Sequence, residues 1–235
     1  MPARAALLMD GGYVIVRLRR SQGIAPSATD ISQLAARLIA DLPGQHDLYR
    51  VFFYHAEPYQ GSVERPLGGG VVKFAETTAA VRNRRLLREL EQTEDFAVRR
   101  GEVRFRGWEL RASVSRALQR RRDAPISASD FVPKIRQKGV DMRIGLDMAA
   151  LALKRLVSTV VVVSGDSDMV PAMRFARREG LRVGLCPLGF AGIRRELRAH
   201  ADFIVDWPGS PDPGASASSP EDPSTASPAP AETRW

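Results

Sequence analysis

Short apolar runs rich in β-branched residues alternate along this chain with longer amphipathic segments. Between the runs, apolar positions recur at three- and four-residue spacing, which predicts helices over roughly 29–42, 76–92, 141–156, 169–179 and 190–199. Alternating strands and helices favour an α/β fold, in which a mostly parallel sheet is covered by helices on both faces. The predicted strands are Ala5–Met9, Asp47–Tyr54, Phe96–Phe105, Thr159–Ser164, Arg182–Cys186 and Phe203–Val205.

Local signals mark the ends and the burial of several of these segments. Thr29 or Asp30 is the expected N-cap of its helix, and Gly180 the expected C-cap of the helix before Arg182. The run Thr159–Ser164 holds four consecutive valines without polar alternation, which is typical of a central strand buried on both faces. Two segments without a clear period, Gln60–Val72 and Ala112–Pro133, are predicted to be loops.

Composition divides the chain into a folded part and a tail. Residues 1–207 are expected to form one domain, since 44% of the 235 residues are hydrophobic. Residues 208–235 are rich in Pro, Ser and Ala and bury too little apolar surface to order themselves, so they are predicted to be a disordered tail. The tail is a candidate for recruiting an unknown protein, and a homodimer is one option for the oligomeric state.

The charge and the cysteine content indicate which kind of partner and which cellular compartment to expect. Lys and Arg number 35 against 27 Asp and Glu, and only four of the 35 are Lys. Guanidinium groups match phosphate geometry, so an anionic partner is favoured, with a solvated arginine-rich surface as the alternative. A single cysteine, Cys186, excludes an intramolecular disulfide and predicts a cytoplasmic setting. No apolar run approaches the roughly 20 residues that cross a bilayer, so no membrane association is expected.

Carboxylates follow two of the predicted strands and line the helix between them. In parallel α/β sheets, functional groups collect beyond the carboxyl ends of the strands, so these side chains are expected at one edge of the sheet. Asp141 could instead cap its helix, and Asp166 and Asp168 could be ordinary turn residues. Asp147 lies about 240° around the helix from Asp141, so the two cannot point in the same direction. The candidate catalytic residues are Asp10, Asp141, Asp147, Asp166 and Asp168.

Acidic side chains gathered at one edge repel one another and favour a compensating cation. Mg²⁺ or Mn²⁺ accepts carboxylate oxygens and supports phosphodiester hydrolysis by activating water. The three histidines, at 46, 55 and 200, are not paired at metal-ligand spacing, which argues against a zinc hydrolase. The candidate metal ligands are Asp10, Asp141, Asp166 and Asp168.

Three segments that contain these acids resemble a known family. They are Leu-Met-Asp-Gly-Gly-Tyr at 8–13, Gln-Lys-Gly-Val-Asp at 137–141 with Asp147, and Val-Ser-Gly-Asp-Ser-Asp-Met-Val-Pro at 163–171. Together they resemble the NYN domains of the LabA-like branch of the PIN-like nucleases, over roughly residues 4–206. Many such proteins carry Asn where this chain has Tyr13.

The resemblance implies a fold and an activity. The fold is a PIN-like, Rossmann-like three-layer sandwich with strand order 3-2-1-4-5, which places Asp10 beside Asp166 and Asp168. The activity is metal-dependent cleavage of RNA, with Mg²⁺ or Mn²⁺ held at Asp10, at Asp141 or Asp147, and at Asp166 and Asp168. Ser164 would supply a nearby hydroxyl.

Basic residues complete the predicted nucleic-acid site. Arginines cluster on one helix and on the strand that follows it, where Arg104, Arg106 and Trp108 are expected on one face, so that a base could stack beside the guanidinium groups. The candidate RNA contacts are Ser164, Lys138, Arg82, Arg84, Arg85, Arg104, Arg106 and Trp108.

Three functions are compatible with these patterns. A metal-dependent ribonuclease is the leading hypothesis. The second is an RNA-binding or regulatory module with weak or no catalysis, motivated by Tyr13 and by the geometry of Asp141 and Asp147. The third, another metal-dependent phosphate enzyme such as a phosphatase or a Toprim-like nuclease, lacks the expected Asp-x-Asp or Glu after the first strand.

Overall fold

The computed structural model describes residues 3–120, 125–190, 192–205 and 207. These residues form two compact units. The first contains 3–55, 86–101 and the described part of 139–207, and the second contains the described part of 56–85 and 102–138. The predicted tail, 208–235, lies outside the described residues.

A mostly parallel sheet forms the centre of the first unit. Strand β1 (Ala3–Asp10) pairs in parallel with β2 (His46–Ala56) and β7 (Thr159–Val163), and β7 pairs in parallel with β8 (Arg182–Cys186). The edge strand β9 (Phe203–Ile204) pairs with β8, and β5 (Phe96–Leu110) follows β2 on the other side. The order β5-β2-β1-β7-β8 is 3-2-1-4-5 when these five strands are numbered along the chain.

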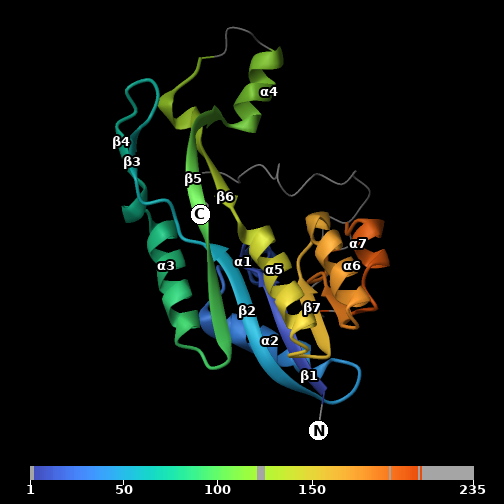
Figure 1. Cartoon of the computed structure of the whole chain (residues 1–235). Helices are drawn as coiled ribbons and strands as arrows, with labels where there is room; N and C mark the ends of the chain where they lie inside the picture. The colour runs from blue at the N-terminus through green and yellow to red at the C-terminus, as the bar shows by residue number, and fades with distance from the viewer. Residues whose placement is uncertain (1–2, 121–124, 191, 206, 208–235) are drawn as a thin grey trace. The chain divides into compact units, whose positions relative to one another are not determined.

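Helices cover both faces of this sheet, as the alternation of strands and helices predicted. Leu7 faces one core with α1 and α2, whereas its neighbour Leu8 faces a second core with α5 and α6. Neighbouring residues of a strand point to opposite faces, so the apolar run Ala5–Met9 of β1 supplies both cores. In Figure 1, α5 and α6 run side by side. The helices that supply residues to these two cores are α1 (Gly11–Gln22), α2 (Ala28–Ala40), α3 (Thr78–Glu91), α5 (Val140–Leu153), α6 (Val170–Arg178) and α7 (Arg195–Ala199).

One helix of the first unit was not predicted, and the N-cap predicted for another was wrong. Helix α1 was not predicted, although Asp10 caps its start and left-handed Gly23 ends it. The N-cap of α2 is Ser27 rather than Thr29 or Asp30; its hydroxyl accepts from the Asp30 amide, and the Asp30 carboxylate accepts from the Ser27 amide. This reciprocal capping box satisfies two amides that the helix itself leaves without partners.

The second unit contains regular structure where loops were expected. A short antiparallel hairpin joins β3 (Ser62–Glu64) and β4 (Val71–Lys73). The later segment forms helix α4 (Ala112–Arg120) and strand β6 (Phe131–Lys138), which pairs antiparallel with β5. Strand β6 is an edge strand, where Pro133 is tolerated because one side of the strand needs no ladder partner.

Aromatic side chains form the core of the second unit. Phe74 is almost fully buried, and its ring lies 5.8 Å from Phe105 and 6.1 Å from Trp108. Tyr59 stacks on Phe105 with ring centroids 5.8 Å apart. Large rings let this small unit bury apolar area with few residues.

None of the helices in the described part of the chain combines the length and the apolar character that crossing a membrane requires.

Candidate active site

Asp10 stands where β1 ends and α1 begins. It caps the helix, and its Oδ1 accepts a hydrogen bond of 3.2 Å from the Tyr13 amide. The next residue must be glycine, because a Cβ on Gly11 would lie 2.7 Å from a ring carbon of Phe53 and 2.8 Å from the carbonyl oxygen of Tyr54. The tight turn therefore holds the carboxylate at the carboxyl end of the sheet.

The second acidic segment follows the neighbouring strand β7. Met9 pairs with Val163, so the residues after each strand emerge at the same edge. Ser164 is fully buried, and its Oγ accepts from the Asp166 amide at 3.1 Å. Asp166 in turn accepts from the Asp168 amide at 2.9 Å. The Ser164 hydroxyl therefore orients residues 166–168, the acidic turn. It was predicted to contact RNA, but it is buried.

Asp141 reaches this edge from the first turn of α5. Gly139 adopts a left-handed conformation, with φ of 78°, immediately before the helix begins at Val140. Helix α5 then packs against α6 and against the short 3₁₀ helix Ser167–Met169. This packing places the start of α5 near the acidic turn.

The carboxylates at this edge act on one another electrostatically. Burial raises the pKa of Asp10 from 3.8 to about 6; the Tyr13 amide opposes this shift, and the charges of Asp141 and Asp166 add to it. The pKa of Asp141 is also raised, mainly by burial and then by Asp166 and Asp168. The nearby negative charges therefore disfavour ionisation of Asp10 and Asp141, as expected for acids that share one site.

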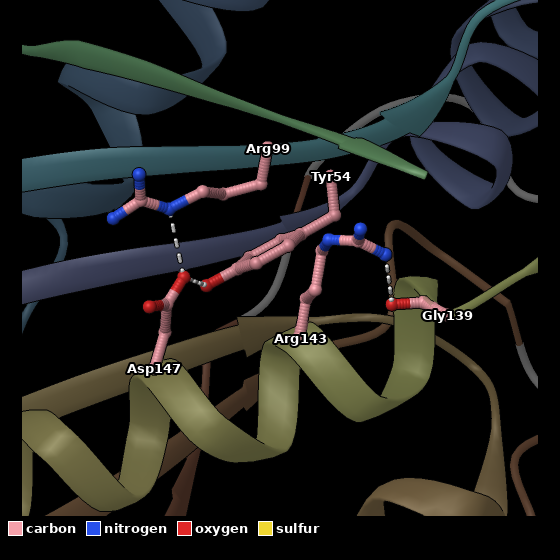
Figure 2. Close-up of polar contacts among 5 residues, drawn as sticks. All are labelled: Tyr54, Arg99, Gly139, Arg143 and Asp147. Atoms are coloured by element: carbon pink, nitrogen blue, oxygen red, sulfur yellow. Dashed lines mark hydrogen bonds and ion pairs between the residues drawn. The ribbon is translucent and has the colours of Figure 1, made fainter. Parts of the chain in front are cut away.

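Asp147 has different surroundings. Figure 2 shows its carboxylate between two partners: Oδ2 accepts from the Tyr54 hydroxyl at 2.9 Å and from Nε of Arg99 at 3.0 Å. The figure also shows Arg143, one turn earlier on α5, donating to the Gly139 carbonyl at 3.0 Å. Asp147 therefore joins α5 to β2 and β5, and its charge is balanced by Arg99.

Two residues near the acids were not predicted as part of the site. The ring of Tyr13 lies so close to Gly165 that a Cβ there would approach Cε2 to 2.7 Å, and the Tyr13 hydroxyl donates to the Pro187 carbonyl. Arg194 donates to the Ser167 hydroxyl at 3.0 Å and brings a cation to the acidic turn. The sequence signal for Arg194 was its position in an arginine pair at the start of α7.

The chemistry of the carboxylate set fits a hard divalent cation, although the set is not closed. All donors are oxygens, and their mutual repulsion would be relieved by positive charge. Across the described ranges, no three His, Cys, Asp or Glu side chains are close enough to enclose one metal ion. Mg²⁺ commonly uses one or two carboxylates and several waters, so an open set of this kind suits it.

The other predicted RNA contacts lie in the second unit. Arg82, Arg104, Arg106 and Lys138 are exposed, and so is Arg85, which has contacts of its own within the structure. Arg84 is only partly exposed and donates to the Ala75 carbonyl at 2.6 Å. Arg104 lies 3.6 Å from Glu102, which offsets part of its charge.

Trp108 does not share a face with Arg104 and Arg106, so this part of the prediction was wrong. The pairing of β5 with β6 shifts register between Phe105 and Trp108, where Gly107 has a φ of 107°. This irregularity turns Trp108 to the face of Phe105, with ring centroids 5.7 Å apart. Its indole nitrogen donates to the Glu64 carbonyl at 2.9 Å, so the ring is part of the aromatic core of the second unit.

A mostly parallel α/β sheet with acids beyond two neighbouring strand ends defines a Rossmann-like protein with an acidic site. A family model described as NYN domain matches residues 72–207, more than half of the chain. This chain belongs to the NYN domain family, which confirms the resemblance and relates the chain to the PIN-like nuclease superfamily. The match includes Asp141, Asp147, Asp166 and Asp168, whereas Asp10 lies before it.

Two individual proteins show similarity as well. The uncharacterized protein y4oD of Sinorhizobium fredii (strain NBRC 101917 / NGR234) is 40% identical over 75 residues, which is 30% of this chain. The chain spans about a third (34%) of that protein's length. The crystal structure of VPA0982, a protein of unknown function from Vibrio parahaemolyticus RIMD 2210633, aligns with a TM-score of 0.47 and 16% identity, covering 87% of this chain and 93% of that one.

Proposed function

We propose that this protein is a metal-dependent ribonuclease that hydrolyses RNA phosphodiester bonds at the carboxylate edge of the first unit. The observation that carries the proposal is that three acids from separate segments, Asp10, Asp141 and Asp166, meet at the edge where the parallel strands β1 and β7 end. A site that only stabilised the fold would not benefit from three like charges near one another. Membership of the NYN family supports a phosphodiester substrate.

Each acid has a role in this mechanism. Asp10, Asp141, Asp166 and Asp168 would hold Mg²⁺ or Mn²⁺, one or two of them directly and the others through its bound waters. The Tyr13 amide and the Ser164 hydroxyl keep Asp10 and the acidic turn in place. A bound ion of this kind lowers the pKa of water and offsets negative charge on the phosphate. Asp147, already bound by Tyr54 and Arg99, would position α5 and thereby Asp141. Arg194 would bind a phosphate oxygen beside the acidic turn.

The test compares wild type with Asp10→Asn and Asp166→Asn on labelled single-stranded and hairpin RNA, in EDTA, Mg²⁺ and Mn²⁺. Wild type is expected to cleave RNA only when metal is present. Both variants should cleave at less than about one hundredth of the wild-type rate. Asp47→Asn, which changes an exposed acid at the start of β2, is the matched control and should cleave normally. Cleavage that survives in both site variants would contradict the proposal.

A second candidate function is RNA binding without turnover. It is favoured by the surroundings of Asp147, one of the five acids predicted to be catalytic, because its carboxylate is already bound by Tyr54 and Arg99. RNA affinity in EDTA, together with no cleavage in either metal, would establish this alternative.

A further inference from the structure

Arginine side chains surround an open hollow in the first unit, away from the carboxylates. Its volume is about 660 Å³, and it lies where α6 ends and β8 begins. The charged and titratable residues that line it are Arg174, Arg177, Arg178, Arg182, His200 and Asp202. None of these residues was among the predicted RNA contacts.

Local structure explains why these arginines meet. Arg174, Arg177 and Arg178 are spaced by three and four residues on α6, so they share one side of the helix. The helix ends at Arg178, left-handed Gly180 follows shortly after it, and the Leu181 amide donates to the Ala176 carbonyl at 3.0 Å. Strand β8 then starts with Arg182, which this short turn brings back beside the helix.

The charges of the hollow are only partly balanced. Arg177 pairs with Asp202 at 2.7 Å, and the second oxygen of Asp202 accepts from the Val183 amide at 2.8 Å, so this pair fixes the wall of the hollow. Arg182 lies over the ring of Phe203, with its guanidinium carbon 4.9 Å from the centroid. In the part of the chain that the structure describes, Arg174 and Arg178 have no carboxylate partner. Of the four guanidinium groups that line this space, three have no carboxylate partner among the described residues, and the one acid that lines it is already paired with Arg177.

Such an arrangement suits phosphate oxygens. A guanidinium group offers a planar fork of donors that matches phosphate, and several such groups at one place repel one another unless an anion is present. The hollow is open to solvent, so it can admit a continuous strand with successive phosphates more readily than it can enclose a small molecule. Its position at the far end of α6, roughly 13 Å along the helix from the acidic turn, separates it from the carboxylates.

We infer that this hollow binds the phosphate backbone of an RNA strand and forms a second contact site for the substrate, apart from the carboxylates. The inference rests on the proposed function, which identifies the bound strand as RNA. The strand would be held at Arg174, Arg178 and Arg182 while another part of it reaches the acidic edge.

The experiment measures binding without catalysis, using a labelled 20-nucleotide single-stranded RNA in EDTA at several salt concentrations. Arg174→Ala/Arg178→Ala should weaken binding about tenfold and lower the slope of log affinity against log salt by about 1.4, since each phosphate contact contributes about 0.7 on single strands. Arg20→Ala/Arg50→Ala removes the same charge from exposed positions on α1 and β2 and is the matched control, with a loss below about twofold. Arg177 is left in place because it pairs with Asp202.

The outcomes separate this inference from the proposed function. Equal affinities of the hollow variant and wild type, equal losses in the hollow and control variants, or no RNA binding by wild type would each overturn the inference. Inorganic pyrophosphate is a second probe: loss of its binding in the hollow variant without loss of RNA affinity would show a small-anion site and also overturn it. If the hollow variant binds RNA more weakly while wild type shows no metal-dependent cleavage, RNA binding at the hollow is supported and the proposed nuclease activity is contradicted.

Discussion

The hydroxyl of Tyr54 donates to Oδ2 of Asp147 at 2.9 Å and so joins the central sheet to helix α5. Tyr54 is fully buried near the end of β2, and burial followed by the negative charge of Asp147 raises its pKa. Arg99 completes the cluster from β5 and also lies over the ring of Phe52, 5.2 Å from its centroid. A buried phenol that has its partner on α5 restricts how that helix, which carries Asp141, can sit on the sheet.

Asp147 is therefore expected to matter for stability more than for catalysis. Asp147→Ala leaves the Tyr54 hydroxyl buried without its acceptor and should lower the free energy of unfolding by about 1–3 kcal/mol. Arg99→Ala removes a half-exposed ion pair and should cost less than about 1 kcal/mol. Urea unfolding measures both. Asp147→Asn keeps an oxygen for Tyr54 and should retain cleavage within a few-fold of wild type; a loss as large as that of Asp10→Asn would show that Asp147 holds the cation directly.

The two glycines after Asp10 should respond differently to alanine. A Cβ on Gly11 would lie 2.8 Å from a backbone oxygen that cannot move aside, so Gly11→Ala should destabilise the fold by about 1–3 kcal/mol. A Cβ on Gly12 would approach only Oδ1 of Asp10, at 3.4 Å, and alanine favours a helix by up to about 1 kcal/mol. Gly12→Ala should therefore be neutral or stabilising in the same urea titration. A similar effect of both substitutions would show that the β1–α1 turn relaxes freely.

Stability without metal should depend on the ionisation of Asp10. Its pKa rises from 3.8 to about 6 on folding, so the folded state binds this proton more tightly, and stability falls as pH rises through that window. Above pH 6 the ionised carboxylate costs up to about 3 kcal/mol. Asp10→Asn removes this cost, and its amide oxygen can still accept from the Tyr13 amide. In EDTA the variant should be more stable than wild type at pH 7.5 and equal to it near pH 4, whereas a constant difference across this range would contradict the assignment.

Divalent cations should offset this difference in stability between wild type and Asp10→Asn. Mg²⁺ or Mn²⁺ binds only the folded carboxylate set, so a concentration one hundred times the dissociation constant should stabilise wild type by about 2.7 kcal/mol. Thermal unfolding with and without metal should show this increase in wild type and in Asp47→Asn, and its loss in Asp10→Asn and Asp166→Asn. An equal increase in all four proteins would place the bound ion elsewhere.

Several features could be predicted from sequence because their signals are local. The run Thr159–Ser164 indicated a central strand, and β7 (Thr159–Val163) is fully buried between two neighbours. Gly180 indicated the end of a helix, and it has a φ of 91° just after α6. Helix α1 was missed because it follows its strand without a loop and its arginines interrupt the apolar periodicity. The capping residues Asp10 and Gly23 did mark its two ends.

Other features depend on contacts between segments far apart in the chain. The face of Trp108 depends on a register shift against β6, and the partners of Asp147 come from β2 and β5, 93 and 48 residues away. The arginine hollow combines the end of α6 with residues that precede β9. Spacing along one helix or strand contains no information about these neighbours.

The sequence by itself determined the α/β class, the acids that follow the strands and the family, because hydrophobic period and short motifs are properties of single segments. The tertiary structure decided which acids influence one another. Parallel pairing of β1 with β7 places Asp10 and Asp166 at one edge, and the packing of α5 against α6 adds Asp141, while Tyr54 and Arg99 bind Asp147. Electrostatic coupling falls with distance in space, and only the folded chain sets that distance.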